Sequence, residues 1–220
     1  MWCAPPEPAL TNVEEDAVAR LRARALVAFD ASNDEHAALL RHLWSCAFPA
    51  QPLPAARGAH WSELGWQGVD PATDLRAAGF LSAECLAYFA EHQSERFGRL
   101  QRKEDGARAS FEYPFCVAGV NLAAALIDAL GVLAVLPKRA KAAAPLAPNR
   151  AFAALLARHP TAFEELFCAA FVRLDKQWLL DRAGYMQFNG VLAKVVAAVQ
   201  AVLARDLDDL TAVCEAVAAC

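Results

Sequence analysis

The sequence predicts an all-α protein. Apolar residues make up 57% of the 220 residues, and many are alanine, which favours helix because it loses no side-chain entropy there. Valines recur at helical spacing in the C-terminal half, as Val191, Val195, Val199 and Val202. A chain of this length buries enough surface for one core, so we expect a single compact multi-helix domain.

Capping signals mark the first helices. Thr11 with Glu14, and Ser32 with Glu35, each fit a capping box, in which a hydroxyl and a carboxylate satisfy free backbone amides. The first box opens an N-terminal helical extension over residues 1–32. The second opens a helix with one apolar face, formed by Leu39, Leu40, Leu43 and Trp44. Three prolines end this helix, namely Pro49, Pro52 and Pro54.

The middle of the chain contains two more predicted helices. Ser82 is expected to cap a helix that continues toward Phe97, and a polar stretch over residues 101–112 is expected to form a loop. Pro114 fits the first position of the helix that follows, because proline has no amide hydrogen to satisfy there.

Residues 115–136 form the most apolar stretch of the chain. They are long enough to cross a bilayer, and only Asn121 and Asp128 are polar. Because these two side chains would be costly in lipid, we interpret the stretch as a long buried central helix. A membrane-spanning helix is the alternative.

The C-terminal half follows a proline-rich stretch at 137–148, which we expect to be a mobile loop. Thr161 with Glu164 fits a third capping box. The helix after it carries large apolar residues on one face, namely Phe163, Phe167, Phe171, Leu174 and Trp178. We expect the main domain to cover residues 33–203, followed by a helical tail at 204–220.

Composition restricts the partners and the compartment. The net charge is −4 and the basic residues are scattered, so we expect no nucleic-acid partner. The N-terminus lacks the features of a signal peptide. The seven cysteines have no CxxC spacing, which indicates buried thiols in a reducing compartment. We therefore expect a cytoplasmic protein whose membrane contact is at most peripheral.

The sequence lacks the motifs of a self-contained active site. Gly65 and Gly68 are not followed by the lysine of a phosphate loop. The five histidines lack zinc-ligand spacing, and no residue lies in a nucleophile motif. We expect no metal and no cofactor. Any effect on catalysis would come from completing the active site of another protein.

Residues 61–79 are the part of the chain that differs most from its surroundings. Trp61 and Trp66 are large enough to anchor an irregular loop on a helical core. Gly65 and Gly68 permit a backbone path that is closed to other residues.

The second half of this segment predicts a short helix. Asp70 and Pro71 fit an N-cap followed by proline at the first helical position, which predicts one or two turns over residues 71–77. Gly79 fits the residue that ends them. The only cation of the segment, Arg76, is then presented on a short braced turn.

Arg76 has two interpretations. An arginine near two aspartates, here Asp70 and Asp74, is most often a structural ion pair that ties down a loop. An arginine inserted into a partner enzyme instead neutralises charge on a transferring γ-phosphate, which raises the rate about 10³- to 10⁵-fold. Arginine suits that role because its planar fork stays charged and holds phosphate oxygens. The residues alone leave both interpretations open.

Three blocks of sequence carry a family resemblance. The first is Trp61-x-x-x-Gly65-Trp66-Gln67-Gly68-x-x-Pro71-x-Thr73-Asp74-x-Arg76-x-x-Gly79. The second is Tyr113 to Leu122, and the third comprises Phe163 to Phe167, Asp175-x-x-Trp178 and Met186-x-Phe188-Asn189-x-Val191-Leu192. In this order they resemble the ELMO (engulfment and cell motility) domain, and most of all its ELMOD branch.

The resemblance implies an all-helical domain. In the ELMOD branch it also implies stimulation of GTP hydrolysis by small GTPases of the Arf and Arf-like family, in their GTP form. The arginine that carries this activity matches Arg76, which Asp74 and Asp70 would position. The ELMO proteins proper act with exchange factors on Rac instead. A non-catalytic module that binds a small GTPase or an exchange-factor complex is therefore the alternative.

Two positions depart from the family pattern. Trp66 stands where the family usually has phenylalanine, and Ala77 stands where glycine usually follows the arginine. If that glycine needs a positive φ, alanine costs about 1 kcal/mol and re-aims Arg76. The remaining candidate site residues are polar side chains that face the partner or brace the loop, namely Gln67, Thr73 and Asn189.

Overall fold

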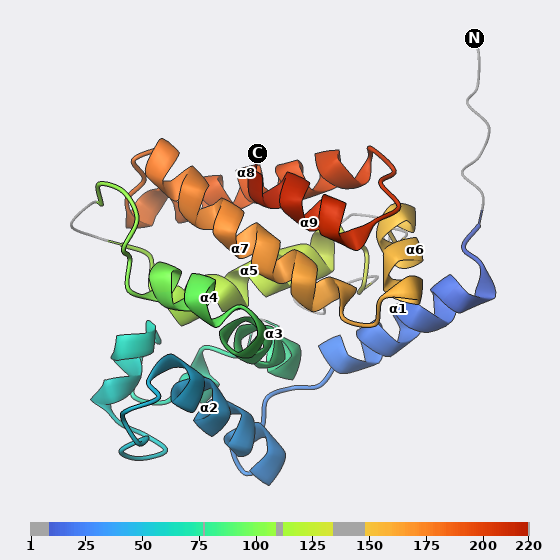
Figure 1. Ribbon diagram of the computed structural model, residues 1–220. Coiled ribbons are helices and arrows are strands. Elements are labelled where there is room, and N and C mark those ends of the chain that lie inside the picture. Colours follow the sequence, from blue (N-terminus) through green and yellow to red (C-terminus); the bar gives the residue numbers. More distant parts are fainter. Residues whose placement is uncertain (1–8, 77, 109–111, 134–147, 220) are drawn as a thin grey trace.

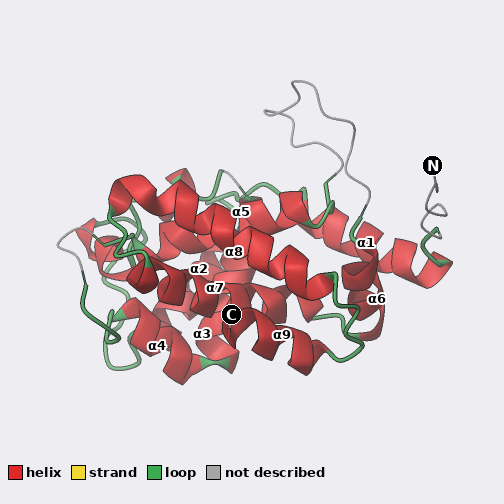
Figure 2. Cartoon of the chain, turned by 90° about the horizontal axis from the view of Figure 1, so that it is seen from above, coloured by secondary structure: helices red, strands yellow, loops and turns green. Residues whose placement is uncertain are grey.

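The computed structural model describes residues 9–76, 78–108, 112–133 and 148–219, and within these residues every regular element is a helix. The prediction of an all-α protein is confirmed, and Figure 2 shows the described residues as helices, loops and turns. The elements in chain order are α1 (Asn12–Ala25), α2 (Asp34–Ala47), η1 (Ala59–Leu64), η2 (Pro71–Thr73), α3 (Gly79–His92), α4 (Ser94–Gln101), α5 (Phe115–Ala129), α6 (Arg150–Arg158), α7 (Ala162–Leu180), η3 (Tyr185–Gln187), α8 (Phe188–Leu203) and α9 (Leu210–Ala219).

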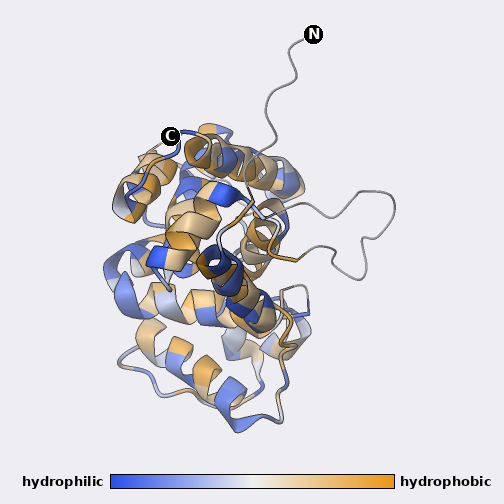
Figure 3. Ribbon diagram, turned by 90° about the vertical axis from the view of Figure 1, so that its right-hand side faces the viewer, coloured by the Kyte–Doolittle hydropathy of each residue, from blue (hydrophilic) through white to orange (hydrophobic). Residues whose placement is uncertain are grey.

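Helix α7 lies at the centre of the fold (Figure 1). It packs against α3, α5, α8 and α9, and the predicted stripe of Phe163, Phe167 and Phe171 is fully buried. Figure 3 shows hydrophobic and hydrophilic residues on the same helices, as expected of amphipathic helices around one core. The core therefore forms around the face that the helical spacing predicted.

Both ends of the described chain join this core. Helix α1, within the predicted extension, packs against α6 and α3 and buries Val18 and Leu21. Helix α9, within the predicted tail, packs against α7 and buries Val213 and Val217. The segments at both ends thus contribute apolar surface to the same interior.

The apolar helix at the middle of the chain, α5, is shorter than predicted. It ends at Ala129 because Gly131 takes a φ of 66°, and the Gly131 amide donates to the Asp128 carbonyl at 3.1 Å. Val132 and Leu133 are buried without being helical. Residues 134–136, and the stretch 137–147 of the expected mobile loop, lie outside the described residues.

The burial of α5 fits a core helix. Most of its 15 residues are buried against α3, α7 and α8, which favours the interpretation as a buried helix over the membrane-spanning alternative. Among the described residues, α5 is too short for a membrane span, and one stretch, Tyr185–Leu203, has the required length and hydropathy, with 28% of it buried. Its valine ridge faces the core, with Val191, Val195, Val199 and Val202 all buried.

The capping predictions gave mixed results. Thr11 and Glu14 form the predicted capping box at the start of α1. Ser32 does not cap α2, because its hydroxyl and amide both donate to Asp30. The next residue, Asn33, caps the helix instead and accepts from the Glu35 amide at 2.9 Å.

The third predicted capping box was also wrong. Thr161 stands at the N-cap of α7 with φ −95° and ψ 13°, which is not the extended backbone that an N-cap side chain needs, and it makes no cap hydrogen bond. The Glu164 carboxylate accepts from Arg24 of α1 instead. A contact between distant segments has therefore displaced a local one.

The predicted helix that runs from Ser82 toward Phe97 is divided in two. Ser82 is buried inside α3, where its hydroxyl donates to the Gly79 carbonyl at 2.8 Å, so it is not the cap. The chain leaves helical geometry at Gln93, which separates α3 from α4. Pro114 is the N-cap of α5, one position before the predicted one.

Candidate functional site

Residues 59–79, which lead from the connection after α2 into the start of α3, are here called the arginine loop. Two tryptophans hold this loop on the core. Trp61 is 1% exposed and its Nε1 donates to the Ala56 carbonyl at 3.0 Å. Its ring meets Trp44 of α2 edge-on, with centroids 5.4 Å apart. Trp66 is also buried, and its Nε1 has no hydrogen-bond partner among the described residues. Both tryptophans lie where anchors of the loop are expected.

The two glycines expected to shape the loop behave differently. Gly65 has a φ of 76°, and a Cβ there would lie 2.1 Å from the Phe115 amide nitrogen. Its carbonyl accepts from the Val117 amide at 3.2 Å, which attaches the loop to the first turn of α5. Gly68 has no positive φ, and a Cβ there would meet nothing nearer than Thr73 Oγ1 at 3.7 Å. The prediction that Gly68 provides a backbone path closed to other residues is therefore wrong.

Asp70 organises the second turn of the loop. Its Oδ1 accepts from the Ala72 amide at 3.0 Å, and Pro71 occupies the first position of η2. Thr73 Oγ1 donates to the Asp70 carbonyl at 2.9 Å. The second carboxylate oxygen of Asp70 pairs with Arg57 Nε at 2.9 Å. The expected N-cap is present, although it opens a single 3-10 turn and not one or two α-helical turns.

Asp74 and Gly79 fix the backbone on the two sides of the arginine. Asp74 Oδ2 accepts from the Gln67 amide at 2.9 Å, which closes the loop across η2. Leu75 is fully buried. Gly79 takes a φ of 58°, and its amide donates to the Leu75 carbonyl at 2.9 Å. A side chain does not fit at this position, because a Cβ on Gly79 would lie 2.3 Å from the Val27 carbonyl oxygen. The chain is thus tied to the core before and after the arginine.

Arg76 is exposed, and it forms no ion pair or hydrogen bond with the residues that the structure describes. The two aspartates expected as its partners are engaged elsewhere, since Asp70 binds another arginine and Asp74 binds a backbone amide. The structural ion pair that we considered is therefore not formed with either of them. Ala77 lies outside the described residues, so its effect on Arg76 stays a prediction.

A segment distant in sequence meets the arginine loop. The side-chain amide of Gln67 donates to the Tyr185 hydroxyl at 3.3 Å, although the two residues are 118 positions apart. Tyr185 belongs to η3, which links α7 to α8, and is 53% exposed, while the neighbouring Met186 is 86% exposed. Asn189 is exposed in the first turn of α8. The structure therefore joins the first sequence block to the residue that directly precedes the last part of the third block.

The exposure of Tyr185 and Met186 was not identified from the sequence. The available signal was an aromatic residue and a methionine directly after Gly184, where the helical apolar pattern is interrupted. Helical spacing says nothing about such a turn, because the outward direction of a side chain there depends on the backbone of the turn itself.

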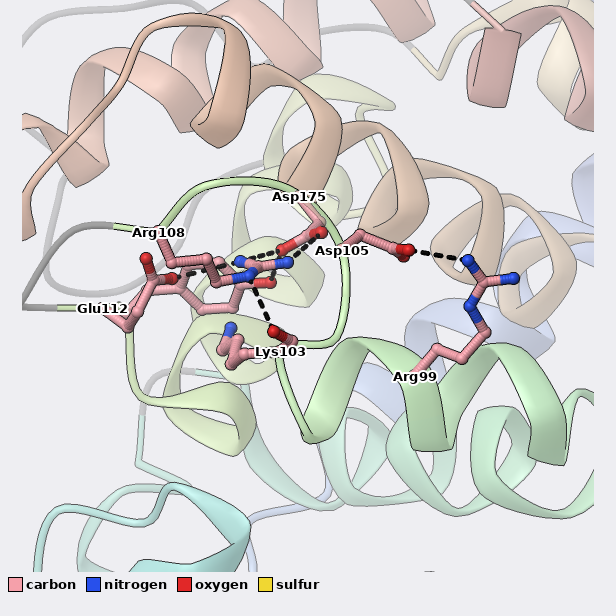
Figure 4. Close-up of polar contacts among 7 residues, drawn as sticks. Arg99, Lys103, Asp105, Arg108, Glu112 and Asp175 are labelled. Carbon is pink, nitrogen blue, oxygen red and sulfur yellow. Dashed lines mark hydrogen bonds and ion pairs between the residues drawn. The ribbon is translucent and has the colours of Figure 1, made fainter.

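A second arginine, Arg108, lies in a buried cluster that is shown in Figure 4. Its Nη1 and Nη2 donate to the two carboxylate oxygens of Asp175 on α7, at 2.9 and 2.7 Å. Glu112 accepts a further bond from Nη1, and the Tyr113 hydroxyl donates to Asp175. Only 11% of the Arg108 side chain and 3% of the Asp175 side chain are exposed. This cluster fixes the segment after α4 on α7.

Lys103 completes the cluster. It takes a positive φ of 57°, and its Nζ lies over the Tyr113 ring with no hydrogen-bond partner among the described residues. Burial lowers the pKa of Lys103 to about 7, and burial together with Asp175 raises the pKa of Tyr113. The sequence did not identify this cluster, because Arg108 and Asp175 are 67 positions apart. Arg108, Tyr113 and Asp175 are joined by hydrogen bonds across distant segments, which indicates a structural role.

Comparisons with known proteins identify relatives. Residues 19–192 match the model of the ELMO/CED-12 family. The chain is 31% identical over 183 residues to ELMO domain-containing protein A of Dictyostelium discoideum, which covers 78% of this chain and 19% of that protein. It is 27% identical over 182 residues to ELMO domain-containing protein 1 of Mus musculus, covering 76% and 52%. The chain thus spans about half or less of the length of these relatives.

Proposed function

The chain belongs to the ELMO/CED-12 family, and we propose that it stimulates GTP hydrolysis by a small GTPase of the Arf or Arf-like family, in its GTP form. In this proposal Arg76 enters the active site of the partner. The observation that carries the proposal is that Arg76 is exposed and unpaired among the described residues while the loop that bears it is tied to the core. The resemblance of the surrounding motif to the ELMOD branch supports the choice of partner.

A cation supplied from outside the GTPase accelerates this chemistry. Charge accumulates on the oxygens of the transferring γ-phosphate in the transition state, and an arginine supplied in trans neutralises it. The guanidinium of Arg76 suits this task because it stays charged and presents donors in a planar fork. Asp70 and Asp74 leave these donors free, since their carboxylates are bound to Arg57 and to the Gln67 amide.

The contacts that fix the arginine loop influence how strongly Arg76 accelerates GTP hydrolysis. A misplacement of about 1 Å in a reacting group lowers a rate by about 10²-fold. The backbone near Arg76 is positioned before a partner arrives, because Gly65 attaches the loop to α5 and Gly79 attaches it to the link before α2. The ordering entropy of the loop is therefore lost during folding and not during association.

The proposal is tested by single-turnover hydrolysis with a panel of GTP-loaded Arf-family GTPases. We expect the chain to accelerate hydrolysis by at least one member, and Arg76→Lys to return the rate to nearly the intrinsic value. Arg20→Lys provides a matched control, because Arg20 is an exposed arginine on α1. Equal stimulation by the Arg76→Lys variant and the wild type would refute the role of Arg76.

The alternative function is a non-catalytic ELMO-type module that binds a small GTPase or an exchange-factor complex. The observation that favours it is Ala77, which replaces the glycine that usually follows the arginine in the family. This alternative predicts binding of a GTP-loaded GTPase without acceleration of hydrolysis. It also predicts that Arg76→Lys leaves the affinity unchanged.

A further inference from the structure

We infer that η3 is a second docking surface for the GTPase partner, on which Met186 contacts an apolar patch beside the phosphate site that Arg76 enters. The inference rests on the proposed function, because the partner of Arg76 is also the occupant of this surface. The inference adds one contact residue, Met186, which is distant in sequence from the arginine loop. This residue determines the affinity for the GTPase and not the rate of the chemical step.

The first support is the exposure of apolar side chains within two positions of Gln67 or Tyr185, the residues whose hydrogen bond joins the two segments. Met186 is 86% exposed and Tyr185 is 53% exposed, both on η3, while Val69 of the arginine loop is 58% exposed. Single exposed apolar residues are ordinary on protein surfaces, whereas a group of them indicates a site of interaction. These three residues lie on the two segments that the Gln67–Tyr185 hydrogen bond joins.

The second support is that η3 is braced in the same way as the arginine loop. The Gly184 amide donates to Gln187 Oε1 at 2.9 Å, and the Gln187 amide donates back to the Gly184 carbonyl at 2.9 Å. The turn is held further by the Ala183 amide, which donates to the Trp178 carbonyl at 3.0 Å. Met186 is therefore an exposed side chain on a fixed backbone and not part of a frayed end.

The chemistry of this surface fits an apolar patch on the partner. Methionine adapts its shape to irregular apolar surfaces, and methionine and tyrosine are enriched in interfaces. None of the three side chains of η3 is charged, and neither Gln67 nor Asn189 carries a charge, so η3 itself offers no charge for phosphate. The two residues then have different roles, since Arg76 binds the phosphates and Met186 packs against the protein surface beside them. Segments of a GTPase near the γ-phosphate are ordered by that phosphate, so this surface favours the GTP form.

The test combines two measurements on the same variants. Affinity is measured by titrating a GTPase loaded with a non-hydrolysable GTP analogue, and the maximal rate is measured by single-turnover hydrolysis over a range of concentrations. We expect Met186→Ser to raise both the dissociation constant and the concentration for half-maximal stimulation about tenfold, with a maximal rate within about twofold of wild type. Arg76→Lys should do the reverse, with a much lower maximal rate and little change in affinity.

Val13→Ser is the matched control, because Val13 is 62% exposed on α1, on the other side of the molecule from the arginine loop (Figure 1). A Met186→Ser variant that binds and stimulates like Val13→Ser would overturn the docking surface and leave the proposed function intact. Binding that depends on Met186, without any stimulation by wild type, would keep the docking surface and reject the catalytic role. Absence of binding across the panel would overturn both.

Discussion

Arg76 and Arg108 occupy opposite environments in one chain. Arg108 is nearly buried and directs both ends of its guanidinium at Asp175, whereas Arg76 is exposed and has no partner among the described residues. Arg108 holds two segments together through its own side chain. Arg76 is held through the backbone of its neighbours, which leaves its side chain available. The comparison shows that an arginine in a well-fixed loop need not be the group that fixes it.

The largest expected effect is on catalysis, from Arg76→Ala. We expect stimulated hydrolysis to fall by about 10³-fold or more, because the in trans cation is lost, while the free energy of unfolding changes by less than about 0.5 kcal/mol, because no internal contact is removed. Single-turnover hydrolysis and urea denaturation measure the two quantities. A large loss of stability would contradict the contrast between Arg76 and Arg108, because it would show that Arg76 also has a structural role.

The opposite result is expected at the buried arginine. Asp175→Asn removes the carboxylate that binds both ends of the buried Arg108 guanidinium and leaves only Glu112 as its counter-charge, and we expect a loss of about 3–5 kcal/mol in the free energy of unfolding. Asp181→Asn is the control, because Asp181 pairs with Lys194, which is 57% exposed, and such surface pairs contribute about 0–1 kcal/mol. Equal effects of the two variants in urea denaturation would show that the Arg108 cluster contributes no special stability.

The backbone support of Arg76 is tested by Gly65→Ala. Alanine at a positive φ costs about 1–3 kcal/mol, and its Cβ would collide with the Phe115 amide, so we expect both lower stability and a lower maximal rate of stimulation. Gly68→Ala provides the matched control within the same loop, because its Cβ would have ordinary contacts. If Gly65→Ala is destabilised but stimulates as well as wild type, the attachment to α5 does not position Arg76.

The smallest expected effect is a pH dependence that belongs to the buried cluster. The folded chain lowers the pKa of Lys103 to about 7, whereas an unfolded lysine titrates near about 10.4. Between these values the unfolded state binds more protons, so the free energy of unfolding rises with pH, by at most about 1.4 kcal/mol per pH unit from this group. Asp175 opposes the lowering and Arg108 adds to it, but burial is the largest cause.

This dependence is measured by urea denaturation of the wild type and of Lys103→Met at pH 6.5 and pH 8.5. We expect the stability of the wild type relative to the variant to be greater at the higher pH. Parallel profiles would indicate that Lys103 keeps the same pKa in the folded and unfolded states.

The predictions from sequence succeeded where a pattern depends on neighbours along the chain. Helical spacing identified the buried face of α7, and the composition of the arginine loop identified Trp61 and Trp66 as residues of the core. Local capping at Thr11 and Asp70 was also identified, because a cap and the amide that it binds lie within three positions. These features follow from backbone geometry and apolar periodicity alone.

Other features depend on partners that spacing cannot indicate. The capping box predicted at Thr161 does not form, because the backbone of Thr161 is not extended and the Glu164 carboxylate binds an arginine 140 positions away. The Gln67–Tyr185 contact and the Arg108–Asp175 pair likewise join distant segments. The interpretation of Arg76 as a structural ion pair was wrong for Asp70 and Asp74, because Asp70 pairs with Arg57 and Asp74 binds the backbone amide of Gln67. The candidate site could therefore be located from its motif, but its neighbours could not.

The close approach of Gly79 to the Val27 carbonyl has a mechanical consequence. Val27 lies in the link between α1 and α2, and its carbonyl accepts from the Phe80 amide at 2.9 Å, directly after the arginine loop. Because α1 packs on α6 and α3, this link acts as a strut between the N-terminal helix and the base of the loop. A displacement of α1 would therefore act on the backbone at Gly79 and Phe80, which couples the position of the N-terminal helix to the base of the arginine loop.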